Sequence, residues 1–144
     1  MNAPWLSNQV IEFIKELKPK TVFEFGSGYS TIFLENIAEK LVSIDHDIRW
    51  YKKIKPELKK TEYHLIHPEK YPEFIKKYNI IFELTLVDGI QREKCILNSI
   101  KNSKIIILDD SEKEKYNSIK TKMKKYHYKT LKENNNETTI WKIK

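Results

Sequence analysis

The chain has one cysteine and no long apolar run, and each of these shortages excludes a class of protein. Because its only cysteine is Cys95, no disulfide can form within the chain, which fits a reducing compartment. No apolar run approaches the ~18 residues that a membrane-spanning helix needs. The segment from Met1 to Trp5 has no basic stretch followed by an apolar core, so it does not resemble a secretory signal. We expect a cytoplasmic protein with no membrane partner.

Arginine is also scarce, although the chain is basic. It has 27 Lys and Arg residues against 20 Asp and Glu residues, a net charge of +7, and such an excess can indicate nucleic-acid binding. The only arginines are Arg49 and Arg92, whereas arginine dominates bidentate contacts to phosphates and bases. The lysines are mixed with Glu, as on a solvated helix surface. We therefore favour a Lys-rich solvated surface and keep a basic nucleic-acid-binding module as the alternative function.

The alternation of apolar patterns predicts the fold class. A length of 144 residues indicates one domain, residues 1–144, without a separate substrate domain. Short β-branched runs alternate with amphipathic helical patterns, which is typical of an α/β fold with a parallel sheet. We expect a helical segment over 1–19 and an α/β core over 20–144. Strands are predicted at 21–25, 41–44, 63–66, 81–87 and 104–108, followed by an antiparallel hairpin of 128–132 and 138–143.

Helices are predicted between these strands. They cover 8–18, 31–39, a segment capped by Asp47, 72–77, a segment after 89 and a segment after 111. The helix after 89 is expected to bury Ile96, Leu97 and Ile100. Ser111 and Glu114 have the spacing of a capping box, so Ser111 is expected to begin the last helix.

Acidic residues follow the predicted strands, and two of the chain's three glycines follow the first one. Glu24-Phe-Gly-Ser-Gly-Tyr-Ser-Thr31 contains Gly26 and Gly28, and Asp45, Asp88 and Asp109 each come directly after a strand. In open α/β sheets, ligands bind outside these carboxyl ends, where Asp45 is placed to accept both hydroxyls of a ribose. A dinucleotide motif would have Gly at position 31, where this chain has Thr31. A carboxylate at Glu24 suits a cofactor that has a cationic amino-acid end and no phosphate, such as S-adenosylmethionine.

Four segments together resemble a known superfamily. They are 24–31, Val42-Ser-Ile-Asp-His-Asp47 with Trp50-Tyr51, Leu86-Val-Asp-Gly89 with Arg92 and Cys95, and Ile107-Leu-Asp-Asp-Ser-Glu112. The chain resembles the class I S-adenosylmethionine-dependent methyltransferases, in particular small members with a Gly-Ser-Gly turn before Ser-Thr. The resemblance implies a three-layer Rossmann-like sandwich with a mostly parallel seven-stranded sheet in the order 3-2-1-4-5-7-6. It also implies methyl transfer to oxygen or nitrogen of an acceptor that the sequence does not identify.

The same resemblance implies a role for each site residue. Glu24, Gly26 and Gly28 would line the methionine end of the cofactor. Ser27, Ser30 and Thr31 would also bind the cofactor, with Ser30 replacing the usual third glycine. Asp45 would hold the ribose, and His46 would lie beside the adenosine. Asp88 would lie near the reactive methyl group and act as the catalytic base. The tryptophans are expected to be packing residues, although Trp5 and Trp50 could border the cofactor crevice.

Two questions stay open at this point. Asp88, Asp109 and Asp110 resemble the acidic cluster with which catechol-type O-methyltransferases hold Mg²⁺, but the usual Asp-Asn pair is Asp109-Asp110 here. We rank a site without metal ahead of a magnesium site. The chain has no insertion long enough for an obvious lid, so the acceptor would be bound by the first helix, by a partner subunit in a homo-oligomer, or in an open cleft.

Overall fold

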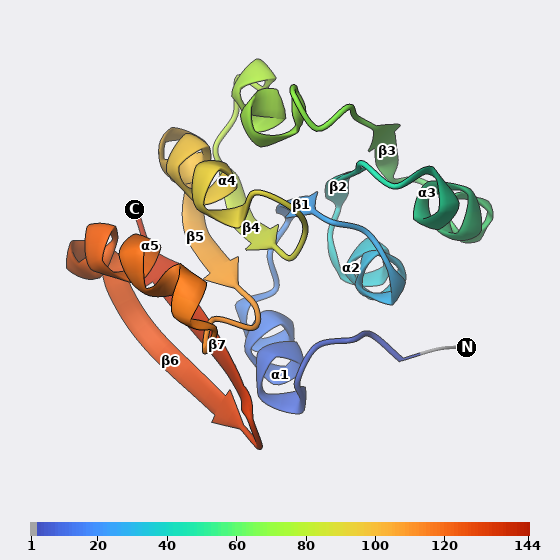
Figure 1. Cartoon of the computed structure of the whole chain (residues 1–144). Coiled ribbons are helices and arrows are strands. Elements are labelled where there is room, and N and C mark those ends of the chain that lie inside the picture. The colour runs from blue at the N-terminus through green and yellow to red at the C-terminus, as the bar shows by residue number, and fades with distance from the viewer. Residues whose placement is uncertain (1–2) are drawn as a thin grey trace.

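The computed structural model describes residues 3–144, which form one seven-stranded sheet with helices on both faces (Figure 1). The strand order is β3-β2-β1-β4-β5-β7-β6, as predicted. The first five strands are parallel, and β7 pairs antiparallel with both β5 and β6. The strands are β1 (Thr21–Phe25), β2 (Lys40–Asp45), β3 (Glu62–Leu65), β4 (Phe82–Val87), β5 (Ser103–Leu108), β6 (His127–Glu133) and β7 (Asn136–Lys142).

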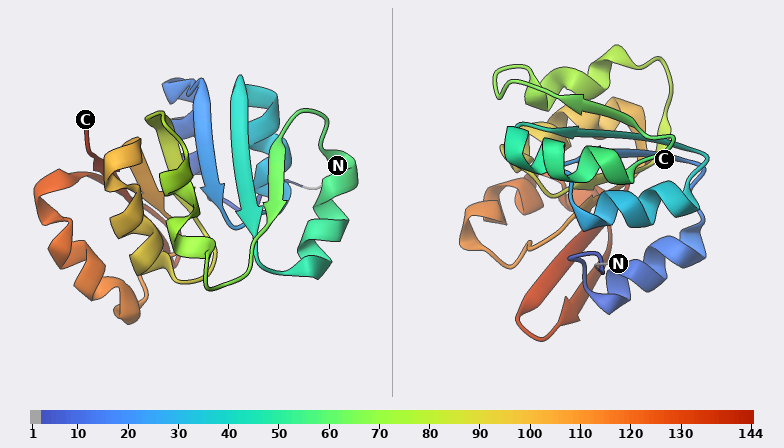
Figure 2. Two further views of the ribbon diagram at one scale, coloured as in Figure 1. Left: turned by 90° about the horizontal axis from the view of Figure 1, so that it is seen from above. Right: turned by 90° about the vertical axis from the view of Figure 1, so that its right-hand side faces the viewer.

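The helices lie in two layers, one on each face of the sheet (Figure 2). Each layer packs against the sheet through its own apolar core. Phe23 and Phe25 of β1 point to one face and pack with residues of α4, α5 and the 3₁₀ segment η2. Val22 points to the other face and packs with α1 and α2, because successive strand residues alternate between faces. The helices are α1 (Asn8–Leu17), α2 (Tyr29–Ile37), α3 (Ile48–Ile54), α4 (Arg92–Ser99) and α5 (Asn117–Lys122). The 3₁₀ segments are η1 (Lys55–Glu57), η2 (Tyr71–Lys77), η3 (Ile100–Asn102), η4 (Glu114–Tyr116) and η5 (Lys124–Tyr126).

Two local predictions are wrong. Leu97 is 40% exposed, because α4 presents Cys95, Ile96 and Ser99 to the sheet instead. Ser111 does not cap the last helix. Its hydroxyl donates to Glu137 at 3.0 Å and its backbone N–H donates to the Glu137 carbonyl at 2.8 Å, so it anchors the chain to β7. The predicted cap at Asp47 is confirmed, since its side chain accepts from the Arg49 N–H at the start of α3.

Within residues 3–144, no helix combines the length and apolar character needed to cross a membrane.

Candidate functional site

A cleft of about 370 Å³ lies at the carboxyl ends of the parallel strands. Its wall contains the loop after β1, the ends of β2 and β4, and the turn after β5. The lining residues are Trp5, Gly26, Ser27, Gly28, Asp45, His46, Asp47, Trp50, Asp88, Gly89, Asp109 and Asp110. We call this cavity the strand-end cleft. Its position is the one at which open α/β sheets bind ligands.

The loop after β1 is held tightly against the end of β4. Gly26 has a φ of +94°, and a Cβ there would lie 2.6 Å from the Asp88 carbonyl oxygen. Only glycine fits both the backbone conformation and the space. Gly28 is different, because a Cβ there would have no atom within 4 Å. The two glycines therefore do separate things: Gly26 permits the fold of the loop, and Gly28 leaves open space beside the cleft.

Asp45 organises the floor of the cleft. One of its oxygens accepts from the Ser27 N–H at 2.9 Å and from the Ser27 hydroxyl at 2.5 Å, and the other accepts from the Asp47 N–H at 2.8 Å. The Ser27 hydroxyl also lies 2.6 Å from the Tyr63 hydroxyl of β3. A carboxylate has about four acceptor sites, so Asp45, which lines the cleft, retains about one, on the oxygen that accepts from the Asp47 N–H.

Glu24 lies beneath the loop and does not line the cleft. Its carboxylate is completely buried and accepts from the hydroxyls of Ser30, Thr31 and Ser43 at 2.6, 2.6 and 2.7 Å. Ser30 and Thr31 are also absent from the cleft lining. Burial raises the pKa of Glu24 to about 7, more than these hydrogen bonds lower it. Glu24, Ser30 and Thr31 thus hold the first turn of α2 against β1 and β2. Their contact with a cofactor stays a prediction.

Glu24 should make folding stability fall as the pH rises. Its pKa is 4.5 without burial and about 7 in the folded protein, so between these values the folded state keeps a proton that the unfolded state has lost. This contribution is complete below about pH 4.5 and is lost as the pH rises through 7, at a cost of about 3 kcal/mol. In urea unfolding from pH 5 to 8, Glu24→Gln should show a shallower decline than the unmodified protein, whereas Glu57→Gln on the exposed η1 should not. If the free energy of unfolding fell as steeply with pH in Glu24→Gln as in the unmodified protein, this role of Glu24 would be contradicted.

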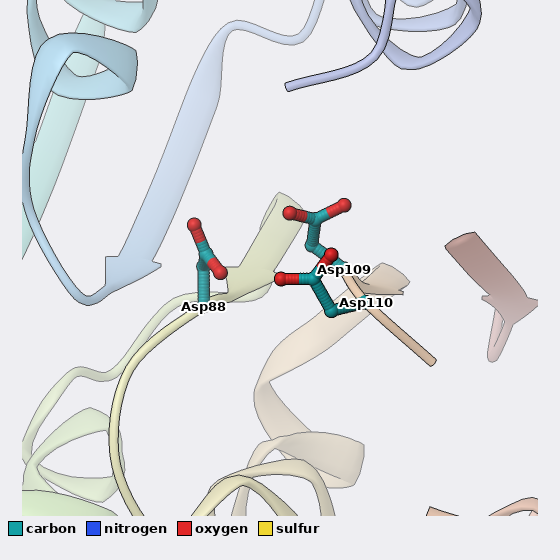
Figure 3. Close-up of side chains that lie close together, drawn as sticks. All are labelled: Asp88, Asp109 and Asp110. Carbon is teal, nitrogen blue, oxygen red and sulfur yellow. The ribbon is translucent and has the colours of Figure 1, made fainter. Parts of the chain in front are cut away.

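The carboxylates of Asp88, Asp109 and Asp110 lie close together at adjacent strand ends, as expected from the parallel sheet (Figure 3). One oxygen of each lies within 4.8 Å of the others. Burial, followed by the charge of Asp109, raises the pKa of Asp88 to about 7. Burial and the charge of Asp110 raise the pKa of Asp109 to about 6. These groups can therefore exchange protons near neutral pH.

Arg92 supplies the positive charge that this cluster needs. Its guanidinium lies 3.2 Å from the Asp88 carboxylate and donates to the carbonyls of Gly89 and Asp109, both at 2.8 Å. One side chain thus ties the end of β4 to the end of β5. This role of Arg92 was not predicted, because Asp88 lies before α4 and the ion pair depends on the course of the turn that joins β4 to α4.

Each of the three carboxylates has one protein partner and keeps further acceptor sites. Asp88 pairs with Arg92, Asp109 accepts from Thr138 at 3.1 Å, and Asp110 accepts from the Asn136 side chain. Arg92 thus compensates part of the negative charge of the cluster.

Comparison with known proteins supports this geometry at the level of fold. No family model and no curated protein sequence matches the chain. A methyltransferase-like protein from Silicibacter pomeroyi is 17% identical, with a TM-score of 0.66 over 96% of this chain and 88% of that chain. An rRNA methylase from Streptococcus thermophilus is 12% identical, with a TM-score of 0.67 over 94% and 95% of the two chains. The N-methyltransferase NodS from Bradyrhizobium japonicum, solved with S-adenosyl-L-homocysteine, is 12% identical, with a TM-score of 0.62 over 99% and 93%.

The chain has the Rossmann-like methyltransferase fold. Many reactions share one fold, so the reaction depends on the residues of the cleft.

Within this methyltransferase fold, the predicted site residues divide into two groups. Those in the cleft wall are Gly26, Ser27, Gly28, Asp45, His46 and Asp88, and those beneath the loop are Glu24, Ser30 and Thr31. The alternative placement of Trp5 and Trp50 at the crevice is confirmed. Their rings meet edge to face at 5.5 Å, and Trp5 meets Tyr29 of α2 in the same way. The cleft therefore has an aromatic rim above an acidic floor.

Proposed function

We propose that the protein is an S-adenosylmethionine-dependent methyltransferase whose methyl donor binds in the strand-end cleft. The observation that carries this proposal is the charge of the cleft. Although the chain has a net charge of +7, the cleft lining contains five Asp residues and neither Lys nor Arg. The donor is cationic at its sulfonium and ammonium groups, whereas the phosphates of a dinucleotide would meet no cation in this wall.

The residues fit the donor in distinct ways. Asp45 presents free acceptor capacity for ribose hydroxyls, and His46 lies beside it at the end of β2. Gly28 leaves the space through which a ligand can approach the backbone at the start of α2. The donor supplies a methyl group that its sulfonium has already activated. The protein therefore has to orient an acceptor and remove a proton, for which Asp88 is the base.

Calorimetric titration tests this assignment. S-adenosylmethionine and S-adenosylhomocysteine should bind at least about ten-fold more tightly than NAD, because NAD brings two phosphates into an acidic cleft. Asp45→Ala should weaken binding by about 2 kcal/mol, or roughly 30-fold, through loss of charge-assisted hydrogen bonds to ribose. Glu57→Ala on the exposed η1, outside the cleft lining, is the control and should leave donor affinity nearly unchanged. NAD binding as tight as that of either methionine derivative would overturn the proposal.

One observation favours the nucleic-acid alternative. A second groove, of about 710 Å³, is lined by Arg92, Lys94, Lys113, Lys115 and Lys122 around the exposed Leu97. Phosphate contacts there would make binding fall steeply with salt. Gel shifts with RNA and DNA at low salt test this alternative. Strong, salt-dependent binding without donor binding would favour it over methyl transfer.

A further inference from the structure

A second cavity opens beside the strand-end cleft. It has a volume of about 450 Å³ and shares Trp5, Asp109 and Asp110 with the cleft, so the two cavities are contiguous. Its other lining residues are Ser7, Glu112, Glu133, Asn134, Asn135 and Asn136. We call it the side pocket. Its lining comes from the segment before α1, the turn after β5 and the β6–β7 turn.

The side pocket has an acidic lining without a basic side chain. It is lined by Asp109, Asp110, Glu112 and Glu133, and within residues 3–144 none of these four carboxylates has a Lys, Arg or His partner within 4.0 Å. Nearby Glu137, by contrast, pairs with Lys120 at 3.1 Å. Like the strand-end cleft, the side pocket is lined by neither Lys nor Arg, so it is the electrostatic complement of a positively charged ligand.

The pocket also offers more hydrogen-bond acceptors than donors. Glu112 accepts from the Glu137 N–H at 2.9 Å and Glu133 from the Asn8 N–H at 3.2 Å, which leaves most of their acceptor capacity unused. Asn136 donates through Nδ2 to Asp110, while its Oδ1 is buried and has no donor. An ammonium group, with three donors and no acceptor, matches this set.

Trp5 forms the boundary between the two cavities. Its side chain is 70% exposed even though its ring contacts Tyr29 and Trp50 edge to face. An exposed tryptophan face attracts a cation and also covers the apolar part of an organic amine. The side pocket therefore combines an aromatic wall with four carboxylates.

We propose that the side pocket binds the methyl acceptor and that this acceptor is a small organic amine that enters as a cation. This inference rests on the proposed function and adds the substrate class to it. For transfer, the amine nitrogen lies at Asp109 and Asp110, which line both cavities, and reaches Asp88 in the strand-end cleft. The ammonium gives one proton to Asp88, and the nitrogen lone pair forms a bond to the methyl carbon. The bond from carbon to sulfur breaks with its electron pair on sulfur, so the sulfonium becomes a neutral thioether and the product is a methylated ammonium.

Three probes of matched shape test the charge preference. Phenethylamine, 2-phenylethanol and phenylacetate are titrated into the protein saturated with S-adenosylhomocysteine, and the Trp5 indole and Asn136 amide signals are followed by NMR. Phenethylamine should bind at least about ten-fold more tightly than the alcohol, phenylacetate should bind most weakly, and added salt should reduce the preference. The inference would be overturned by equal affinities for the three probes or by the absence of any chemical-shift change at millimolar probe. Chemical-shift changes confined to the signals of Lys94, Lys113 and Lys115 would also overturn it.

Paired variants separate charge from structure. Glu112→Gln with Glu133→Gln keeps an oxygen acceptor for the N–H of Glu137 and of Asn8, so the fold should survive. This double variant should reduce the preference for the amine at least about three-fold without changing S-adenosylhomocysteine affinity, whereas Glu57→Gln should change neither. An unchanged preference in the double variant would contradict the inference. Failure of S-adenosylhomocysteine to bind would instead overturn the proposed function, and the probes titrated alone would still report on the side pocket.

Discussion

Asp88→Asn is expected to lower turnover about 100-fold while changing S-adenosylmethionine affinity by no more than about three-fold. The amide keeps the size of the side chain but cannot accept a proton from the acceptor. Arg92 should stay in place, because it also donates to the carbonyls of Gly89 and Asp109. The loss should therefore appear in the chemical step and not in donor binding.

The pH dependence of turnover gives an independent signature of the same role. A base must be ionised to accept a proton, and burial raises the pKa of Asp88 to about 7. Turnover should rise with pH through about 7 and then level off, and Asp88→Asn should remove this rise. A chelator should have no effect, because Arg92 already compensates the cluster. If chelation stopped turnover and magnesium restored it, a metal ion and not Arg92 would compensate the charge of the acidic cluster. Full turnover by Asp88→Asn would remove Asp88 from the chemistry.

Gly26→Ala is expected to destabilise the fold by about 3 kcal/mol or more. The new Cβ would lie 2.6 Å from the Asp88 carbonyl oxygen, and relieving this clash would require the backbone at the end of β4 to move. The residue would also have a φ of +94°, which L-residues rarely adopt. Urea unfolding followed by circular dichroism measures the loss. Donor binding should fail together with the fold, since the same loop forms one wall of the strand-end cleft.

Gly28→Ala is the matched control two residues away. Its backbone is extended, and a Cβ there would have no atom within 4 Å. Stability should change by no more than about 1 kcal/mol. S-adenosylhomocysteine affinity should fall about ten-fold, because the methyl group would occupy space beside the cleft. If Gly28→Ala unfolded the protein more than Gly26→Ala, the described course of the loop would be contradicted.

The positions of the strands and of the acidic strand ends could be predicted because both follow from short-range patterns, whereas the order of the sheet was implied by the resemblance to the class I methyltransferases. Alternating apolar runs locate the strands, and parallel strands bring Asp45, Asp88 and Asp109 to one edge. The burial of Glu24 could not be predicted in this way, since it depends on Ser43, a residue of the neighbouring strand in the β1–β2 register. No pattern within the segment 24–31 distinguishes a carboxylate that faces a ligand from one that holds the loop from below.

Other features depend on contacts between distant segments. Leu97 is exposed because of the rotation of α4, which begins after Gln91 in a left-handed conformation with φ of +50°. Ser111 has the spacing of a helix cap, but Glu137 of β7 supplies better partners. The side pocket was not predicted, because Asp110 and Asn136 meet only when the hairpin folds back on β5.

The side pocket is held by the two outer parts of the described chain, where the Asn8 N–H donates to Glu133 and the Gln9 side chain donates to the Lys132 carbonyl. The strand-end cleft instead belongs mainly to β1, β2 and β4 and to the loops that follow them. In the proposed assignment, the donor cleft and the acceptor pocket are thus formed mainly by separate stretches of sequence, although they share Trp5, Asp109 and Asp110. Exposed hairpin turns tolerate substitution and insertion well. Changes in the β6–β7 turn would therefore alter the side pocket and leave the loop after β1 intact.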